Sequence, residues 1–408
     1  MTDRKAAASS TAGSTTAAST TAASTTAGGG VTDVGADARR TALEVLARVA
    51  DDGAYANLAL GAALGRSGLS EQDRGFVTDL VYGTLRRQRT CDHLVDRFLT
   101  SDPPGPARRA LRLGAYQLAF RDDVPSYAAV AATVQATPKR FRGLVNAVLR
   151  KVSSASTTPP DDRTELSYPD WIIDLLRTDL GAEAADAAMR EMNESPEVTI
   201  RADGYVQDLA SQWVAELTGG APGEMVLDLC AAPGGKATAI AGTGATVVAA
   251  DLQPHRVGLV ASNAARLGTT DVRPVVADAA HPPFRPGAAD VVLLDAPCSG
   301  LGVLRRRPDA RWRLEPAAPQ RLAELQRRLI EVAASLVRPG GTLVYSVCTL
   351  SARESRGVDE HLASTRPDLV PLDPPGEPWA PWGRGAILLP QAASTDGMCI
   401  FRYRRTDG

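Results

Sequence analysis

Two cysteines lie at the ends of two strongly apolar runs. Residues 290–300 read Asp-Val-Val-Leu-Leu-Asp-Ala-Pro-Cys-Ser-Gly, and residues 341–350 read Gly-Thr-Leu-Val-Tyr-Ser-Val-Cys-Thr-Leu. Each run is typical of a buried parallel strand. Ligands of open α/β sheets bind outside the carboxyl ends of such strands, so Asp295, Cys298 and Cys348 are expected to face one site. Thiols there could act as nucleophiles; the alternative is that each is an inert, buried apolar residue.

A glycine-rich turn follows an earlier apolar run. Residues 225–236 read Met-Val-Leu-Asp-Leu-Cys-Ala-Ala-Pro-Gly-Gly-Lys, which predicts a strand, a tight turn and the start of a helix. Glycines let the backbone approach a ligand closely, and a helix start offers free N–H groups to an anion. A P-loop would need glycine at 230 and serine or threonine at 237, whereas this chain has Cys230 and Ala237. The turn is therefore not a P-loop.

Acids end the next two predicted strands. Asp251 closes the run 246–251, sixteen residues beyond Gly235, and Asp278 follows the run 272–277. A nucleotide-type site of this architecture needs such an acid for ribose hydroxyls, and the second could receive an adenine amine. Each acid alone could instead be a helix cap. Either a dinucleotide or S-adenosylmethionine would fit this frame.

Residues 36–152 show helical periodicity without strand-like alternation, which predicts an all-α bundle. Ser70 and Asp73 form a capping signal at one helix start. The basic residues gather in three groups, either as a solvated surface or as an RNA-facing patch. They are Arg86, Arg87 and Arg89; Arg108, Arg109 and Arg112; and Lys139, Arg140, Arg142, Arg150 and Lys151.

Composition sets the outer limits. The 408 residues predict several domains, and a formal net charge of −2 argues against binding nucleic acid through overall charge. Five scattered cysteines and four histidines favour neither a disulfide framework nor a zinc site, and we expect a reducing cytoplasm. We expect Cys91, Cys399 and the side chain of Cys230 to be inert. The predicted divisions are a disordered Ala/Ser/Thr tail over 1–35, a helical domain over 36–152, a linker over 153–162, a connector over 163–205 and an α/β domain over 206–406.

The helical region resembles the NusB-like RNA-binding domain, in the form fused to bacterial 16S ribosomal RNA (cytosine-5) methyltransferases of the RsmB/Sun family. The segments that carry this resemblance are Asn57-Leu, 80–86, 111–117 and 143–150. The α/β region resembles the same family in Asp-Leu-Cys-Ala-Ala-Pro-Gly-Gly-Lys (228–236), Asp251, Asp278, 295–300, 305–312 and 345–349. The implied fold is multidomain α and α/β, with a helical bundle followed by a Rossmann-like methyltransferase core.

The resemblance implies S-adenosylmethionine as cofactor and assigns roles to the site residues. Its amino-acid part would lie among Cys230, Ala231, Ala232, Pro233, Gly234, Gly235 and Lys236. Asp251 would bind the ribose, Asp278 would lie near the adenine, and Asp295 would contact the reacting centre. Strand-end geometry alone does not rank the two thiols. By resemblance, Cys348 attacks C6 of a cytosine and Cys298 helps to release the adduct.

Three departures from the family pattern carry expectations of their own. A short strand at Val198–Arg201 runs almost at once into the catalytic region, so most of the family's connector subdomain is missing. Ala352-Arg-Glu-Ser355 replaces the usual Pro–Glu–Asn turn, and we expect weaker support behind Cys348. Met398-Cys399 replaces a Phe-Phe pair, which alters core packing on the last strand.

Five arginines and a tryptophan follow the Pro-Cys turn, over Arg305–Arg313. Phosphate contact and base stacking are natural uses of such a segment; the alternative is an exposed loop held by tryptophan packing.

The sequence thus predicts a cytoplasmic, monomeric RNA cytosine-5 methyltransferase that acts on 16S ribosomal RNA, with no metal and no membrane contact. The alternatives are another RNA substrate such as transfer RNA, a non-catalytic RNA-binding or ribosome assembly factor, and an NAD-dependent oxidoreductase.

Overall fold

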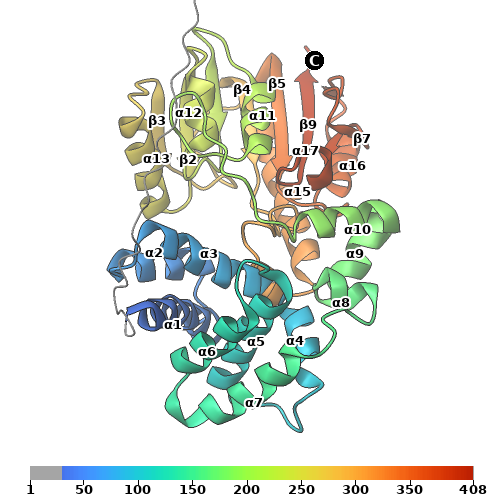
Figure 1. Cartoon of the computed structure of the whole chain (residues 1–408). Coiled ribbons are helices and arrows are strands. Elements are labelled where there is room, and N and C mark those ends of the chain that lie inside the picture. The colour runs from blue at the N-terminus through green and yellow to red at the C-terminus, as the bar shows by residue number, and fades with distance from the viewer. Residues whose placement is uncertain (1–29, 408) are drawn as a thin grey trace, which may run out of the picture.

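The computed structural model describes residues 30–407, so the predicted tail lies outside the described residues except at its end, where helix α1 begins at Gly30. Helices α1 to α7 form the N-terminal bundle seen at the bottom of Figure 1. Their bounds are α1 Gly30–Asp51, α2 Ala56–Arg66, α3 Glu71–Arg86, α4 Gln88–Asp96, α5 Gly105–Phe120, α6 Ser126–Ala136 and α7 Arg142–Ser153. The all-α prediction for this region is confirmed.

Small residues set the spacing inside the bundle. A side chain at Gly114 of α5 would meet Leu149 of α7 at 2.3 Å, so these two helices touch through the glycine. The predicted cap is present: the Ser70 hydroxyl accepts a hydrogen bond from the Asp73 amide at the start of α3. The sequence therefore predicted correctly that this region is helical and where α3 begins.

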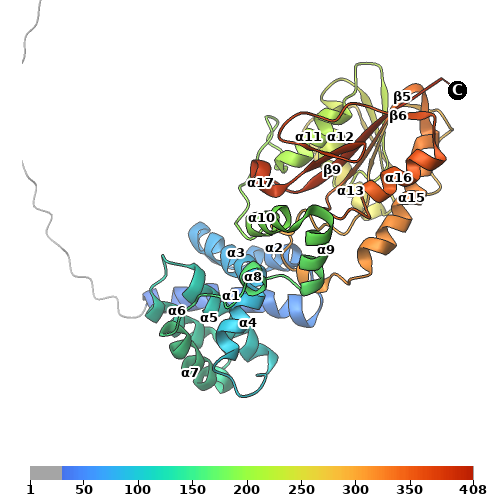
Figure 2. The same cartoon turned by 90° about the vertical axis from the view of Figure 1, so that its right-hand side faces the viewer.

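A group of three helices joins the bundle to the sheet. These are α8 Asp162–Leu166, α9 Asp170–Leu180 and α10 Ala182–Glu191, and Figure 2 shows α9 and α10 between the bundle and the sheet. The predicted strand at Val198–Arg201 is wrong. Ile200 makes only an isolated antiparallel bridge to Val206, because the chain turns back after Arg201 and no further strand extends the pairing.

The C-terminal region is built on a nine-stranded sheet, counted within residues 30–407, with the order β3-β2-β1-β4-β5-β9-β8-β7 and β6 paired to β9. Strands β1 to β5 are parallel, and β9 joins β5 in the antiparallel direction. The strands are β1 Met225–Asp228, β2 Thr246–Asp251, β3 Val272–Val276, β4 Ala289–Asp295, β5 Val337–Val347, β6 Leu369–Pro371, β7 Ala380–Trp382, β8 Gly385–Leu388 and β9 Met398–Arg405.

Helices cover both faces of this sheet. One face packs against α15 (Ala318–Leu336) and the connector helices, and the other against α11 (Leu209–Thr218), α12 (Gly235–Ala241) and α13 (Pro254–Arg266). The remaining helices are α14 Ala310–Arg313, α16 Arg356–Thr365 and α17 Pro390–Ala393. The chain leaves β1 toward β2 and β3 and returns to β4 on the other side of β1. This reversal is the switch point at which ligands of doubly wound sheets bind.

Candidate active site

The glycine-rich turn after β1 has the tight geometry that the sequence predicts. Gly234 has a φ of +101°, and a side chain there would lie 3.2 Å from the Cα of Val260 in α13. Only glycine is tolerated in that backbone conformation at such close range. The turn therefore packs directly against α13 and leaves its outer side facing a cleft.

A cleft of about 760 Å³ runs along the carboxyl ends of the parallel strands. Cys230, Ala232, Asp251 and Asp278 line it from β1, β2 and β3, and Asp295, Cys298 and Cys348 line it from β4 and β5. Ala231, Pro233, Gly234, Gly235 and Lys236 are not among its lining residues. The structure thus gathers the predicted acids and both thiols on one cleft, but only part of the predicted turn faces it.

Asp251 is held in place at the end of β2 by contacts within the protein. Its carboxylate is almost completely buried, accepts a 3.3 Å hydrogen bond from the Ala232 amide and pairs with Arg256 at 3.2 Å. Asp278, at the end of β3, is half exposed and accepts a 2.9 Å hydrogen bond from the Ala280 amide. Neither carboxylate caps a helix: α13 begins at Pro254, its N-cap Gln253 has no side-chain cap hydrogen bond, and no helix within residues 30–407 starts directly after Asp278. The helix-cap alternative is therefore wrong for both acids.

Asp228, the last residue of β1, is a buried acid that the sequence analysis did not single out. Its side chain is buried, and its Oδ1 atom has no hydrogen-bond partner. Burial and the neighbouring charge of Asp295 raise its pKa to about 7, against the opposing effect of Lys236. A buried acid with an unused oxygen beside the glycine turn can receive the amino group of a ligand. Its place in the Asp-Leu-Cys run was the only available sequence signal.

Lys236 faces the reacting centre. Its Nζ atom donates to Asp295 Oδ2 at 2.6 Å, and the Ser346 hydroxyl donates to Asp295 Oδ1 at 2.7 Å. Burial lowers the pKa of Lys236, but the charge of Asp295 more than offsets this, and the net pKa is raised. Lys236 is therefore a cation that orients Asp295, rather than only a part of the cofactor turn.

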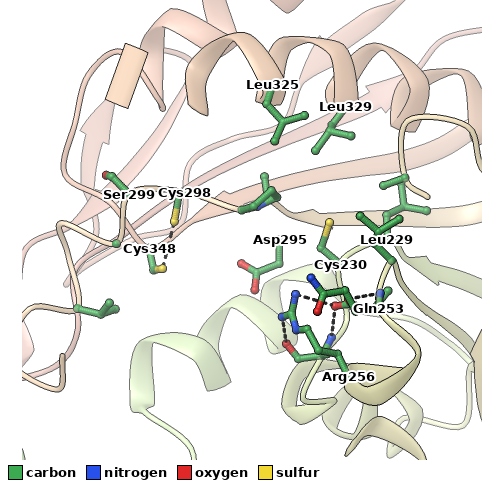
Figure 3. A pocket seen from close by; sticks show the side chains of 18 of the residues that line it. Leu229, Cys230, Gln253, Arg256, Asp295, Cys298, Ser299, Leu325, Leu329 and Cys348 are labelled. Carbon is green, nitrogen blue, oxygen red and sulfur yellow. Dashed lines mark hydrogen bonds and ion pairs between the residues drawn. The ribbon is translucent and has the colours of Figure 1, made fainter. Parts of the chain in front are cut away.

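The two thiols are in direct contact. The Cys298 and Cys348 sulfur atoms lie 3.2 Å apart, within hydrogen-bond range, and Figure 3 shows both beside Asp295. The hydrogen bond to Cys348, followed by burial, raises the pKa of the Cys298 thiol. The contact therefore favours the protonated form of Cys298.

The expectation of weak support behind Cys348 is wrong. Glu354 is fully buried, and its carboxylate accepts hydrogen bonds from the Ser299 amide at 2.7 Å, the Ser299 hydroxyl at 2.5 Å and the Thr349 hydroxyl at 3.2 Å. Gln326 donates a further hydrogen bond at 3.2 Å. Ser299 and Thr349 each follow a site cysteine. The glutamate alone, without the usual proline and asparagine, joins the two cysteine turns.

The remaining cysteines take the inert role predicted for them. Cys91 and Cys399 are fully buried, and burial raises the pKa of each thiol. Burial also raises the pKa of Cys230, although this residue touches the cleft. All five cysteines are free.

Comparison with known proteins decides the family. The family model described as 16S rRNA methyltransferase RsmB/F matches residues 217–404, and the NusB family model matches residues 36–154. Ribosomal RNA small subunit methyltransferase B of Thermus thermophilus is 37% identical over 90% of this chain and 98% of its own length. A probable enzyme of the same name from Synechocystis is 33% identical over 90% of this chain and 99% of its own. This chain belongs to the RsmB/F family of 16S rRNA methyltransferases.

Membership in the RsmB/F family makes the chain a methyltransferase that uses S-adenosylmethionine. The oxidoreductase and the purely non-catalytic alternatives are therefore wrong. The fold agrees: the crystal structure of PH0851, which is 22% identical, matches with a TM-score of 0.74 over 91% of this chain and 99% of that one.

The residues of this RsmB/F chain suit the cofactor. S-adenosylmethionine carries an amino group, ribose hydroxyls and an adenine. Asp251 and Asp278 offer acceptors on the cleft, while Asp228 lies buried at the end of β1 with an unpartnered Oδ1 atom and is not among the lining residues. No helix within residues 30–407 has the length and apolar character needed to cross a membrane. The same residues contain no group of three or more His, Cys, Asp or Glu side chains suited to a metal ion.

Arg311 and Trp312 of the arginine segment in this RsmB/F chain make contacts within the protein. Arg311 is fully buried and donates to the backbone oxygens of Arg86 and Met192 and to Asn193, while the Trp312 indole donates to the Leu85 oxygen. These partners belong to the bundle and the connector. Arg311 and Trp312 therefore connect the catalytic domain to the helical domain and the connector. Of the two interpretations of this segment, the loop held by tryptophan packing agrees better with these contacts.

The second basic group of the bundle, Arg108, Arg109 and Arg112, is paired with acidic side chains. Arg108 and Arg112 pair with Asp92, and Arg109 pairs with Asp51 at 2.8 Å. Because these cations are neutralised within the domain, they are not an open RNA-facing patch.

Proposed function

We propose that this protein transfers a methyl group to C5 of a cytosine in small-subunit ribosomal RNA, through a covalent bond between Cys348 and cytosine C6. The observation that carries the proposal is the pair of cysteine sulfurs 3.2 Å apart, beside the Lys236–Asp295 pair and in the same cleft as the cofactor acids. The substrate follows the printed names of the relatives.

Cytosine C5 is a poor nucleophile until a thiolate adds to C6. In this proposal, the Cys348 sulfur forms that bond, and the electron pair of the C5–C6 double bond moves toward N3 and becomes available at C5. Asp295 accepts a hydrogen bond from the exocyclic amine, and Lys236 donates to the ring, which stabilises the charge that develops there. When bound, S-adenosylmethionine supplies an electrophilic methyl group.

Release requires a base, and the geometry supports Cys298 for that role. While Cys348 is free, the contact between the thiols keeps the pKa of Cys298 high. Because its sulfur lies 3.2 Å from that of Cys348, Cys298 is close to the adduct, and in this proposal its thiolate takes the C5 proton. Removal of that proton restores the double bond and expels Cys348 as a thiolate.

We also propose a division of labour along the cleft. Asp251 binds the ribose hydroxyls, Asp278 lies near the adenine, and Cys230 and Ala232 contact the amino-acid part together with Asp228. The domain divisions at 152, 162 and 205 remain predictions. We propose that the protein acts as a monomer, without a metal, in the cytoplasm, where its five free cysteines stay reduced.

Bisulfite sequencing of ribosomal and transfer RNA tests this function. RNA from cells with the wild-type protein, with Cys348→Ala and without the protein would be compared. The proposal expects one protected cytosine in small-subunit RNA that is lost in both deficient strains. A loss confined to transfer RNA would keep the chemistry and move the substrate. Unchanged protection everywhere would refute the reaction. Activity in the presence of EDTA and light scattering test the metal and monomer proposals.

A further inference from the structure

One wall of the cleft comes from the helical domain. Tyr55, the residue that begins α2, lines the same cavity as Asp278, Cys298 and Cys348. Its side chain is 58% exposed, although a tyrosine ring carries a large apolar area that folding usually buries. Figure 1 shows α2 facing α13 and β2 of the catalytic domain. The helical domain thus places an aromatic ring at the mouth of the active site.

The backbone that carries this ring is fixed from the catalytic domain. The buried Asp309 carboxylate accepts a 3.3 Å hydrogen bond from the Ala56 amide, the residue after Tyr55. The same carboxylate accepts a 2.6 Å hydrogen bond from Arg313. The Arg313 guanidinium lies 4.3 Å from the centre of the Tyr55 ring. One face of the ring is therefore backed by a cation, and the exposed remainder is available to a ligand.

The surroundings of Tyr55 suit a single strand of nucleic acid. Leu252, which lines the same cavity, is 61% exposed. Arg307 and Arg313 line the cavity as cations. Flat apolar surface next to guanidinium groups is the combination by which proteins stack bases and hold phosphates of unpaired strands.

We infer that Tyr55, backed by Arg313, is a stacking platform for a nucleobase adjacent to the target cytosine. The helical domain then supplies a positioning residue to the substrate site, in addition to any contact with distant RNA. This inference rests on the proposed function. A base next to the target must leave its own stack when the target enters the thiol pocket, and the aromatic ring compensates for that lost stacking.

Kinetics with an RNA fragment that contains the methylated cytosine test the inference. Loss of one stacked base weakens binding by about 5- to 100-fold. Tyr55→Ala should therefore raise KM for RNA by at least about 5-fold, with kcat and S-adenosylmethionine affinity nearly unchanged. Tyr55→Phe and Tyr55→Trp should restore KM because each keeps a ring. The matched control is Tyr127→Ala in α6, where the ring is 79% exposed and does not line the cleft.

Direct binding separates this inference from the chemistry. The RNA fragment would carry 2-aminopurine beside the target and would be bound to the Cys348→Ala protein, which cannot form the adduct. Stacking on Tyr55 predicts fluorescence quenching that disappears with Tyr55→Ala and persists with Tyr55→Phe. Unchanged quenching and KM in Tyr55→Ala would overturn the inference, as would a defect that neither Phe nor Trp repairs. If the RNA binds and quenches with the wild-type protein but is never methylated by it, the proposed function fails instead.

Discussion

The single buried carboxylate of Glu354 should govern both stability and catalysis. It accepts hydrogen bonds from four donors: the amide and hydroxyl of Ser299, the hydroxyl of Thr349 and the side-chain amide of Gln326. Removing it by Glu354→Ala leaves these donors in a buried site without their acceptor. Each unsatisfied donor costs about 1–3 kcal/mol, and partial relaxation recovers some of this, so a loss of about 3 kcal/mol or more in the free energy of unfolding is expected.

Two other substitutions calibrate this value. Glu354→Gln keeps the shape and one strong acceptor, and the hydroxyls of Ser299 and Thr349 can rotate to accept from the new amide, so a loss of about 1 kcal/mol is expected. Glu360→Ala, at an exposed position of α16, should change stability by no more than about 0.5 kcal/mol. Urea denaturation followed by circular dichroism measures all three.

Catalysis should respond in the same order. Because Glu354 joins the residues that follow both cysteines, its loss lets the two sulfurs shift relative to the cleft, and a displacement of about 1 Å costs roughly 100-fold in rate. The expected kcat is about 100-fold lower for Glu354→Ala, measured at a temperature where the variant is folded. A folded Glu354→Ala protein that loses under 1 kcal/mol and keeps wild-type kcat would refute the bracing role.

Three further outcomes are expected. Arg311→Ala removes the donors to three buried acceptors between domains and should lower the free energy of unfolding, measured by urea denaturation, by about 3 kcal/mol. Arg307→Ala, at an exposed position, should leave it nearly unchanged. Equal effects of the two substitutions would contradict the role of Arg311 in holding the domains together. Burial, the neighbouring Asp208 and the opposing Arg306 leave the pKa of Asp396 raised to about 7. Its contribution to stability is therefore complete below about pH 4 and is lost as the pH rises to about 7, and Asp396→Asn should flatten that fall between about pH 4 and 7 in urea titrations. Cys298→Ala should accumulate a protein–RNA adduct visible on denaturing gels, and its absence would argue against a release role.

The fold was largely readable from the chain because its signals are local. The apolar run before Asp295 is buried along the strand, as a parallel strand must be, and the turn at Gly234 needs a residue without a side chain. The convergence of Cys298 and Cys348 followed from a general rule, since parallel strands deliver their carboxyl ends to one edge. The 3.2 Å contact between their sulfur atoms could not be predicted in this way, because it depends on side-chain directions within two turns.

Long-range partners explain the errors. Arg311 and Trp312 look like RNA contacts in sequence, but their acceptors are backbone oxygens that lie far away along the chain and that no sequence pattern marks. Glu354 seemed unsupported because its neighbours differ from the family turn, yet its partners come from three separate segments. Tyr55 gave no signal, because only the docking of the two domains brings it to the cleft.

The central claim is that Cys348, rather than Cys298, bonds to the target cytosine. Small-subunit RNA fragments carrying 5-fluorocytidine at the target would trap this bond, because fluorine at C5 blocks the proton removal that releases the enzyme. Mass spectrometry of the digested adduct would then locate the modified peptide. The account predicts the nucleotide on Cys348 in the wild-type protein and no adduct with Cys348→Ala. A nucleotide attached to Cys298, or an adduct that survives Cys348→Ala, would contradict it.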